Sequence, residues 1–196
     1  DAPQLRYFTR FLTAELQPGD SVILCSATPT WVTTADEKHR DAFNSLHWFD
    51  RNYIRTRHDD EGQIEQTGAS VRLWITGDSH HYARFAERRK DEVAIPDTAE
   101  QEAGTEPVLP PDAQRRQMVT CGLGGAYLSA THDLPDVLPL PPAKSRVLQK
   151  GEGPTTFARA DVCYPDRATS ARWSRRLCTS TSSTMPSWST ARHSQC

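Results

Sequence analysis

The 196-residue sequence has no long apolar run, no surplus of either charge and no closely spaced cysteines. No segment approaches the roughly 18 consecutive apolar residues of a membrane span, and no signal-peptide pattern opens the chain, so we expect neither. With a net charge of -2, the sequence lacks the excess of basic residues that is typical of nucleic-acid-binding proteins. Five cysteines, none in a CxxC pair, argue against a disulfide framework or zinc ribbon. We therefore expect a reducing, cytoplasmic setting.

The C-terminal segment 164–196 differs in composition from the rest of the chain. Its 33 residues include 13 Ser or Thr but only one residue among Val, Ile, Leu and Phe, namely Leu177. Such a segment cannot bury enough apolar surface to offset its ordering entropy. We predict a folded part at 1–163 and a disordered tail at 164–196, dispensable beyond about Ala171. Its arginines leave a second interpretation, a basic tail for an acidic partner, and a shifted reading frame is a third.

Alternating helical and strand patterns predict an α/β fold. Leu5, Phe8, Leu12 and Leu16 recur at helical spacing, whereas Ser21–Ser26 is a continuous apolar run typical of a strand buried on both faces. The predicted elements are a helix ending before Pro18, a strand at Ser21–Ser26, a helix at 36–57 with a buried aromatic stripe, and strands at Val71–Thr76 and Gln117–Leu128.

Three segments are expected to lie outside these elements. Residues 58–68 form a polar break, and residues 91–112 contain seven acids, four prolines and no base, which is typical of a solvated loop. The proline-rich segment 135–154 is expected to wrap the surface in extended form.

The sequence GDSHHY at residues 77–82 is the strongest candidate site. It directly follows the predicted strand Val71–Thr76, and ligands of open α/β sheets gather at the carboxyl ends of strands. Asp78, His80 and His81 offer a carboxylate and two imidazoles, which suit Zn, Mn or Fe. From residue types alone, a turn with capping or packed histidines is an equally good interpretation.

Two further motifs allow a functional and a plain interpretation. GLGGAYL at 122–128 lacks the Gly-Lys-Ser/Thr of a P-loop and the GxGxxG spacing of a dinucleotide site, so close backbone approach is favoured. His132-Asp133 matches a metal-dependent His-Asp phosphohydrolase in residue type. Its position between Gly-rich and Pro-rich segments favours a local turn instead.

Taken together, GDSHHYARF followed about 40 residues later by GLGGAYLSATHDLP resembles the calcineurin-like metallophosphoesterases. Within them, the sequence is similar to the C-terminal part of a large bacterial branch with a Gly-Asp-x-His-His-Tyr motif. The resemblance implies the second half of a layered α/β sandwich and hydrolysis of a phosphoester by metal-activated water. It places Asp78 and His80 as ligands within a site of two divalent metals (Mn, Fe or Zn), and His81 beside the substrate phosphate.

The chain also departs from that family pattern. Asp78 stands where the family usually has His, and the earlier Asp-x-His, Gly-Asp-x-x-Asp and Gly-Asn-His motifs are absent. We therefore expect an incomplete fragment of a phosphoesterase, and the resemblance implies a full-length protein that continues into membrane-associated sequence. The alternative is a non-catalytic truncated product or a weak binding module.

Overall fold

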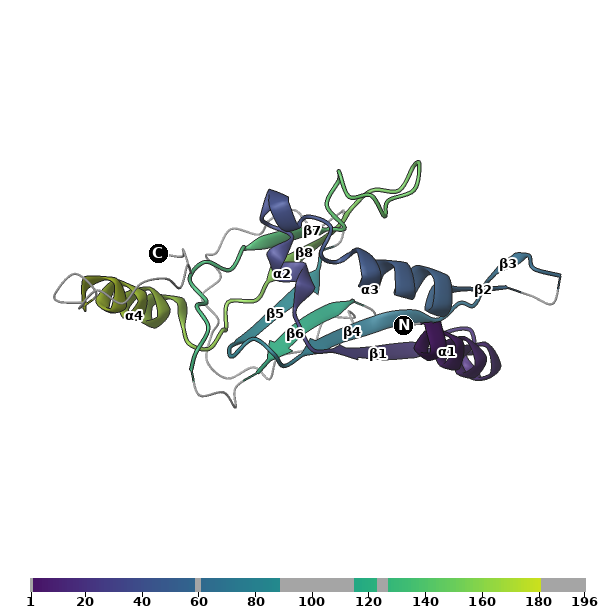
Figure 1. Cartoon of the computed structure of the whole chain (residues 1–196), viewed down its shortest axis with the longest axis horizontal. Coiled ribbons are helices and arrows are strands. Elements are labelled where there is room, and N and C mark those ends of the chain that lie inside the picture. The colour runs from purple at the N-terminus through teal and green to yellow at the C-terminus, as the bar shows by residue number, and fades with distance from the viewer. Residues whose placement is uncertain (1, 59–60, 89–114, 123–126, 181–196) are drawn as a thin grey trace, which may run out of the picture.

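The computed structural model describes residues 2–58, 61–88, 115–122 and 127–180 (Figure 1). In chain order the elements are α1 Ala2–Glu15, β1 Ser21–Ser26, α2 Thr30–Thr33, η1 Glu37–His39, α3 Asn44–Phe49, η2 Asp50–Arg55, β2 Thr56–His58, β3 Ile64–Gln66, β4 Ser70–Thr76, β5 Tyr82–Glu87, β6 Gln117–Cys121, β7 Val137–Leu140, β8 Thr155–Arg159 and α4 Arg167–Ser180.

A six-stranded mixed sheet organises these elements, in the order β1-β4-β6-β5-β8-β7. β1, β4 and β6 are parallel, so their carboxyl ends lie at the same edge. β5, β8 and β7 extend the sheet with antiparallel pairings. β2 and β3 form a separate hairpin. The chain is therefore an α/β protein, as the alternating pattern predicted.

The apolar core lies between the sheet and the helices α3 and η2. Trp74 of β4 is 2% exposed and contacts Phe43 and Phe157 through ring centroids 6.3 and 6.5 Å apart. The ring of Phe8 on α1 lies 5.5 Å from that of Phe49, which attaches α1 to the same layer. The aromatic stripe is thus partly in the core, as predicted, but Trp48 is 40% exposed.

Three predicted elements differ from those observed. The strand predicted at Gln117–Leu128 ends at Cys121 as β6, and residues 127 and 128 lie outside any strand. β1 is not buried on both faces: Val22 and Leu24 are partly buried, whereas side chains on the other face are exposed, with Ile23 61% exposed. The helix predicted at 36–57 is broken into η1, α3 and η2, with turns around Ala42 between η1 and α3.

The polar and proline-rich segments contain strands that the sequence patterns did not predict. The polar break 58–68 includes half of the β2–β3 hairpin. Segment 135–154 is not merely a surface wrap, since β7 joins the sheet with Leu138 and Leu140 only 1% and 2% exposed. The expected solvated loop at 91–112 lies outside the described residues.

The predicted tail boundary at 163/164 is also wrong for the described part of the segment. Tyr164 exchanges two backbone hydrogen bonds with Tyr82, at 2.8 and 3.0 Å. Residues 167–180 form α4 instead of a disordered chain, and Ser170 is 3% exposed. Figure 1 shows α4 at one end of the molecule, away from α1 and α3. The remainder of the predicted tail, 181–196, lies outside the described residues.

Candidate functional site

The loop 77–81 begins where β4 ends, at the edge shared by the three parallel strands. Thr76 aligns with Ser26 of β1 and Thr120 of β6. The backbone N–H groups of Gly77 and Asp78 both donate to the carbonyl of Ala27, at 3.2 and 3.0 Å. The predicted position of GDSHHY at a strand end is therefore confirmed, and the loop is fixed to the segment that follows β1.

Gly122 permits the close approach of β6 to this loop. A Cβ at this position would lie only 2.2 Å from the carbonyl oxygen of Gly77 and 2.4 Å from that of Ser79. Its N–H donates to the carbonyl of His81 at 3.2 Å. This first glycine of the Gly-rich motif thus has the backbone-approach role that the sequence favoured. Residues 123–126 of the motif lie outside the described ranges.

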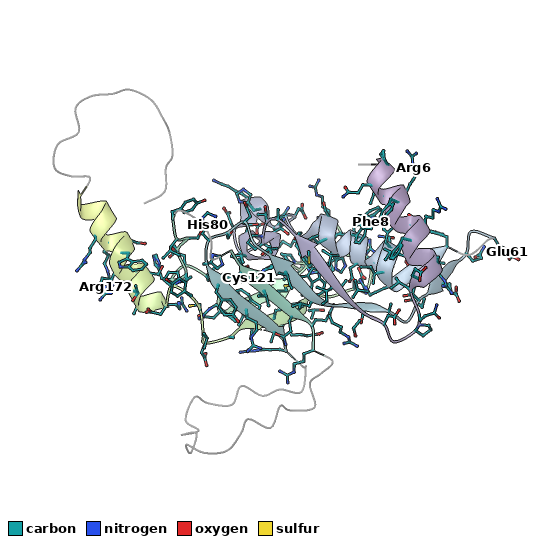
Figure 2. The ribbon with its side chains drawn as sticks, turned by 90° about the horizontal axis from the view of Figure 1, so that it is seen from below. Arg6, Phe8, Glu61, His80, Cys121 and Arg172 are labelled. Carbon is teal, nitrogen blue, oxygen red and sulfur yellow. The ribbon has the colours of Figure 1, made fainter. Side chains whose placement is uncertain are left out.

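His80 is held in one orientation by the segment 127–129. Its Nδ1 lies 3.1 Å from the carbonyl oxygen of Tyr127, which can only accept, so the ring carries its proton on Nδ1. Its backbone N–H donates to Ser129 Oγ at 3.1 Å, and its carbonyl accepts from the Ser129 N–H at 3.0 Å. Nε2 is therefore the nitrogen whose lone pair is left for a ligand. Figure 2 shows His80 at the periphery of the molecule.

Asp78 is the second candidate ligand and lies exposed at the beginning of the loop. Its Oδ2 accepts a hydrogen bond from Thr28 Oγ1 at 3.3 Å, so a side chain from the β1 end orients the carboxylate. Within the described ranges, no group of three or more His, Cys, Asp or Glu side chains is placed to hold a metal. Asp78 and His80 are a borderline-to-hard donor pair that suits Mn, Fe or Zn.

His81 differs from the expectation that it borders a substrate phosphate. The side chain is only 4% exposed, and neither ring nitrogen has a hydrogen-bond partner among the described residues. Burial lowers the pKa of His81, so the ring is favoured in its neutral form. A ring turned into the protein cannot contact a ligand at the loop surface. The alternation of side chains explains this placement, because His81 immediately precedes β5, whose next inward residue is Ala83.

His132-Asp133 lies in a turn, as its plain interpretation predicted, and not on a helix. Its neighbours form a contact network that the sequence did not indicate. His132 Nδ1 lies 2.8 Å from Ser170 Oγ, which also accepts the Thr131 N–H at 2.9 Å. Thr131 Oγ1 donates to the carbonyl of Pro165 at 2.7 Å. These bonds attach α4 to the turn.

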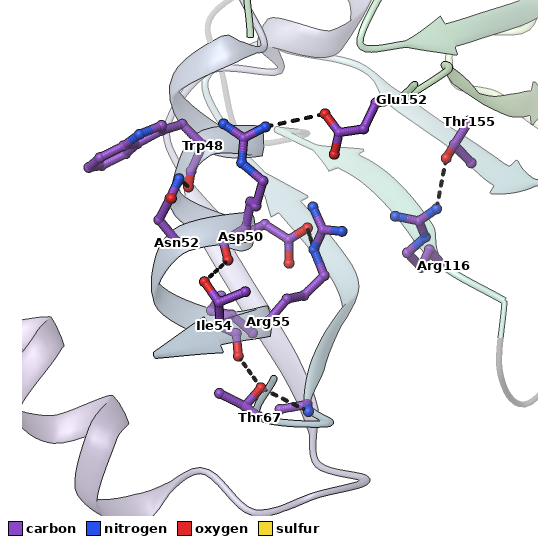
Figure 3. A network of polar contacts seen from close by, with 12 residues as sticks. Trp48, Asp50, Asn52, Ile54, Arg55, Thr67, Arg116, Glu152 and Thr155 are labelled. Atoms are coloured by element: carbon purple, nitrogen blue, oxygen red, sulfur yellow. Dashed lines mark hydrogen bonds and ion pairs between the residues drawn. The ribbon is translucent and has the colours of Figure 1, made fainter. Parts of the chain in front are cut away.

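A second polar cluster surrounds η2, as Figure 3 shows. Arg116 forms two hydrogen bonds to the Glu87 carboxylate, at 2.8 and 2.9 Å, and one to Thr155. Nearby, Asp50 is 3% exposed and lies 3.0 Å from Arg55 Nε. Burial raises the pKa of Asp50, and Arg55 opposes that shift. These opposite charges are paired with one another.

A cavity of about 120 Å³ lies beside this second cluster. His47 and Trp74 line it, and the Nε2 of His47 and Nε1 of Trp74 have no partner among the described residues. Burial, with Arg55 next in importance, lowers the pKa of His47 to about 4. Nothing in the residues around His47 indicated this buried environment.

Comparison with known proteins returned no match of any kind: no family model, curated protein or solved structure is similar to the chain. Over the residues that the structure describes, no helix is both long enough and apolar enough to cross a membrane.

Proposed function

We propose that the chain takes part in metal-dependent hydrolysis of a phosphoester, with Asp78 and His80 as metal ligands. The orientation of His80 is the observation that carries this proposal. Histidines that bind metals commonly donate their second ring N–H to a carbonyl or carboxylate, which fixes the tautomer and the ring. The contact of His80 Nδ1 with the Tyr127 carbonyl at 3.1 Å is of this kind and leaves the Nε2 lone pair for the metal.

A divalent metal would supply a water of lowered pKa and polarise the phosphoryl oxygens. The chain's own contribution is to position donors at the carboxyl ends of parallel strands. Asp78 in place of a histidine adds a negative charge and favours Mn or Fe over Zn. We assign no chemical step to His81, because its ring is buried.

The second candidate is a non-catalytic, weakly metal-binding module. The observation that favours it is the donor count, since the described residues bring no third His, Cys, Asp or Glu to the pair. Water would then complete the coordination, and affinity would be low. For either candidate we propose a reducing, cytoplasmic setting, in keeping with the free thiols of Cys25, Cys121 and Cys163.

Calorimetric titration of Mn²⁺ and Zn²⁺ into the wild-type chain and His80→Ala tests the ligand assignment. We expect weak binding to the wild type and at least about tenfold lower affinity in the variant. His39→Ala is the control, because His39 is exposed on η1, where its ring contacts the nearby Asp36, and lies outside the strand-end loop. Identical isotherms for wild type and His80→Ala would exclude the assignment.

Hydrolysis of 4-nitrophenyl phosphate with added Mn²⁺ separates the two candidates. Turnover that His80→Ala abolishes supports the phosphoesterase. Metal binding through His80 without any turnover supports the binding module.

A further inference from the structure

An apolar groove of about 470 Å³ lies between α4 and the segment that precedes His132. Tyr127, Leu128 and Trp173 line it and are 66%, 38% and 39% exposed. Ala130, Pro165, Ser170, Ser174 and Arg176 complete the lining. The groove is thus mainly aromatic and aliphatic, its described lining has no acidic side chain, and its size falls within the range of small-molecule sites.

The groove is continuous with the strand-end loop. Tyr127 lines the groove, while its carbonyl accepts from His80 Nδ1 and its ring centroid lies 4.3 Å from that of His80. Ser129, in the same short segment, bonds both backbone groups of His80. A ligand with one end at His80 therefore meets Tyr127 as its next neighbour.

The walls of the groove are held together by buried hydrogen bonds. Ser170 at its base is 3% exposed and accepts from the N–H of Thr131, which is fully buried. Arg167, at the beginning of α4, donates to the carbonyl of His132 at 2.8 Å and pairs with Asp136 at 2.7 Å. These bonds fix α4 against the turn that follows segment 127–130, so the spacing between the two walls is set by the fold.

We propose that this groove binds the apolar organic group of the substrate, so that the substrates are aryl or apolar alkyl phosphoesters. The inference rests on the proposed function, in which Asp78 and His80 would hold the metal that binds the phosphate. Three features support this occupant: the shared residue Tyr127, an aromatic lining that stacks on a ring, and the lack of acidic side chains in the described lining around an anionic ligand. A sugar phosphate would leave most of its hydroxyl groups without partners there.

The test compares phenylphosphonate with methylphosphonate, which share an anionic head and differ in the apolar group. Binding to the whole chain is measured by NMR titration without Mn²⁺ and by calorimetry with Mn²⁺. In both experiments we expect phenylphosphonate to bind about tenfold tighter than methylphosphonate. Trp173→Ala should bring this ratio close to one, and Trp173→Phe should restore most of it. Trp48→Ala is the matched control, since Trp48 is 40% exposed but lies on α3, outside the groove.

The outcomes distinguish this inference from the function on which it rests. His80→Ala should weaken Mn²⁺-dependent binding of both phosphonates and leave their ratio unchanged. A ratio that depends on Trp173 without any effect of Mn²⁺ supports the groove and contradicts the metal site. An affinity ratio near one in the wild type overturns the groove assignment, and so does a ratio that Trp173→Ala does not change. Either result is expected if a protein segment occupies the groove instead of a substrate.

Discussion

Two clusters of polar side chains lie at opposite ends of β6 and differ in how their charges are used. The strand-end loop 77–81 lies next to the C-terminal end of β6, at Cys121. In this loop the Asp78 carboxylate accepts a hydrogen bond from Thr28, and His80 Nδ1 contacts the Tyr127 carbonyl. The cluster before Gln117 pairs Arg116 with Glu87 and places Asp50 against Arg55. In the first cluster, the Nε2 of His80 is left for a ligand. In the second, Glu87 and Asp50 are paired with arginines of the protein itself.

The difference shows that residue type alone does not identify a site. Both clusters combine carboxylate and imidazole side chains, but the arginines of the second cluster change the chemistry of its carboxylates. Burial tends to raise the pKa of Glu87, yet the hydrogen bonds and charge of Arg116 outweigh it and hold that pKa below its usual value. A carboxylate committed to such a pair is not available as a ligand. The comparison predicts that mutations in the second cluster affect stability, whereas mutations in the loop affect binding.

Arg116→Met should give the largest loss of stability. Both side chains of the Arg116–Glu87 pair are 25% exposed. The substitution removes the two side-chain hydrogen bonds to the Glu87 carboxylate, which keeps only the backbone N–H of residue 116. We expect the free energy of unfolding to fall by roughly 2–3 kcal/mol, less than for a fully buried pair, because both side chains are partly exposed to solvent. Urea denaturation followed by circular dichroism measures it.

Arg57→Met is the control for that experiment. Arg57 pairs with Glu65 at the same 2.8 Å distance, but on the more exposed β2–β3 hairpin. Solvent screens a surface pair of this kind, so its loss should change the free energy of unfolding much less. Equal losses for the two variants would contradict the distinction between a buried and an exposed pair.

Gly122→Ala should lower both the stability of the fold and the affinity of the loop for metal. The added Cβ would overlap two backbone carbonyl oxygens of the loop, which cannot rotate away as a side chain can. We expect a loss of about 2 kcal/mol in stability together with weaker metal binding, because the loop must shift. Gly153→Ala is the control, since a Cβ there would meet nothing within 4 Å beyond its chain neighbours. Unchanged metal affinity in a destabilised Gly122→Ala would show that the loop geometry does not govern the site.

The sequence predicted the elements whose signal is local. The apolar run at Ser21–Ser26 and the strand at Val71–Thr76 were located within one residue, and the loop that follows was placed at a strand end. The two strands follow from the pattern of neighbouring residues. The loop was singled out because ligands of α/β sheets bind at the carboxyl ends of strands. The β5 strand was not predicted, although Ala83 and Phe85 on its inner face are both fully buried.

What the sequence could not supply were contacts between distant segments. Nothing in the composition of 164–180 indicated that Ser170 would dock on Thr131, so a segment poor in apolar residues was predicted to be disordered. The burial of His81 is likewise set by the pairing of β5 with β6 and not by its neighbours in GDSHHY. For the candidate site, the sequence could name Asp78 and His80 only as candidates, whereas the tautomer of His80 required the Tyr127 carbonyl.

The smallest expected effect is a pH dependence from the second cluster. Burial, followed by Arg55, lowers the pKa of His47 from 6.5 to about 4 in the folded chain. Between these values the unfolded chain binds a proton that the folded chain does not, so stability falls as the pH drops from 6.5 toward 4. His47→Leu should reduce this slope in urea denaturation at several pH values. The reduction should stay well below the single-proton limit of about 1.4 kcal/mol per pH unit, because His47 is only partly buried.

The window from about pH 6.5 to about pH 5 isolates this contribution of His47. The stabilising shift of Asp41, whose pKa is lowered to about 2, is lost only at more acidic pH. Asp50 has the opposite sign, since a raised carboxyl pKa makes stability fall as the pH rises, and it is present in both proteins. His81 has the same sign as His47 and also remains in the variant, so the slope should decrease without vanishing. His39→Leu, at an exposed position, is the control, and an equal decrease of the slope in that variant would contradict the assignment to His47.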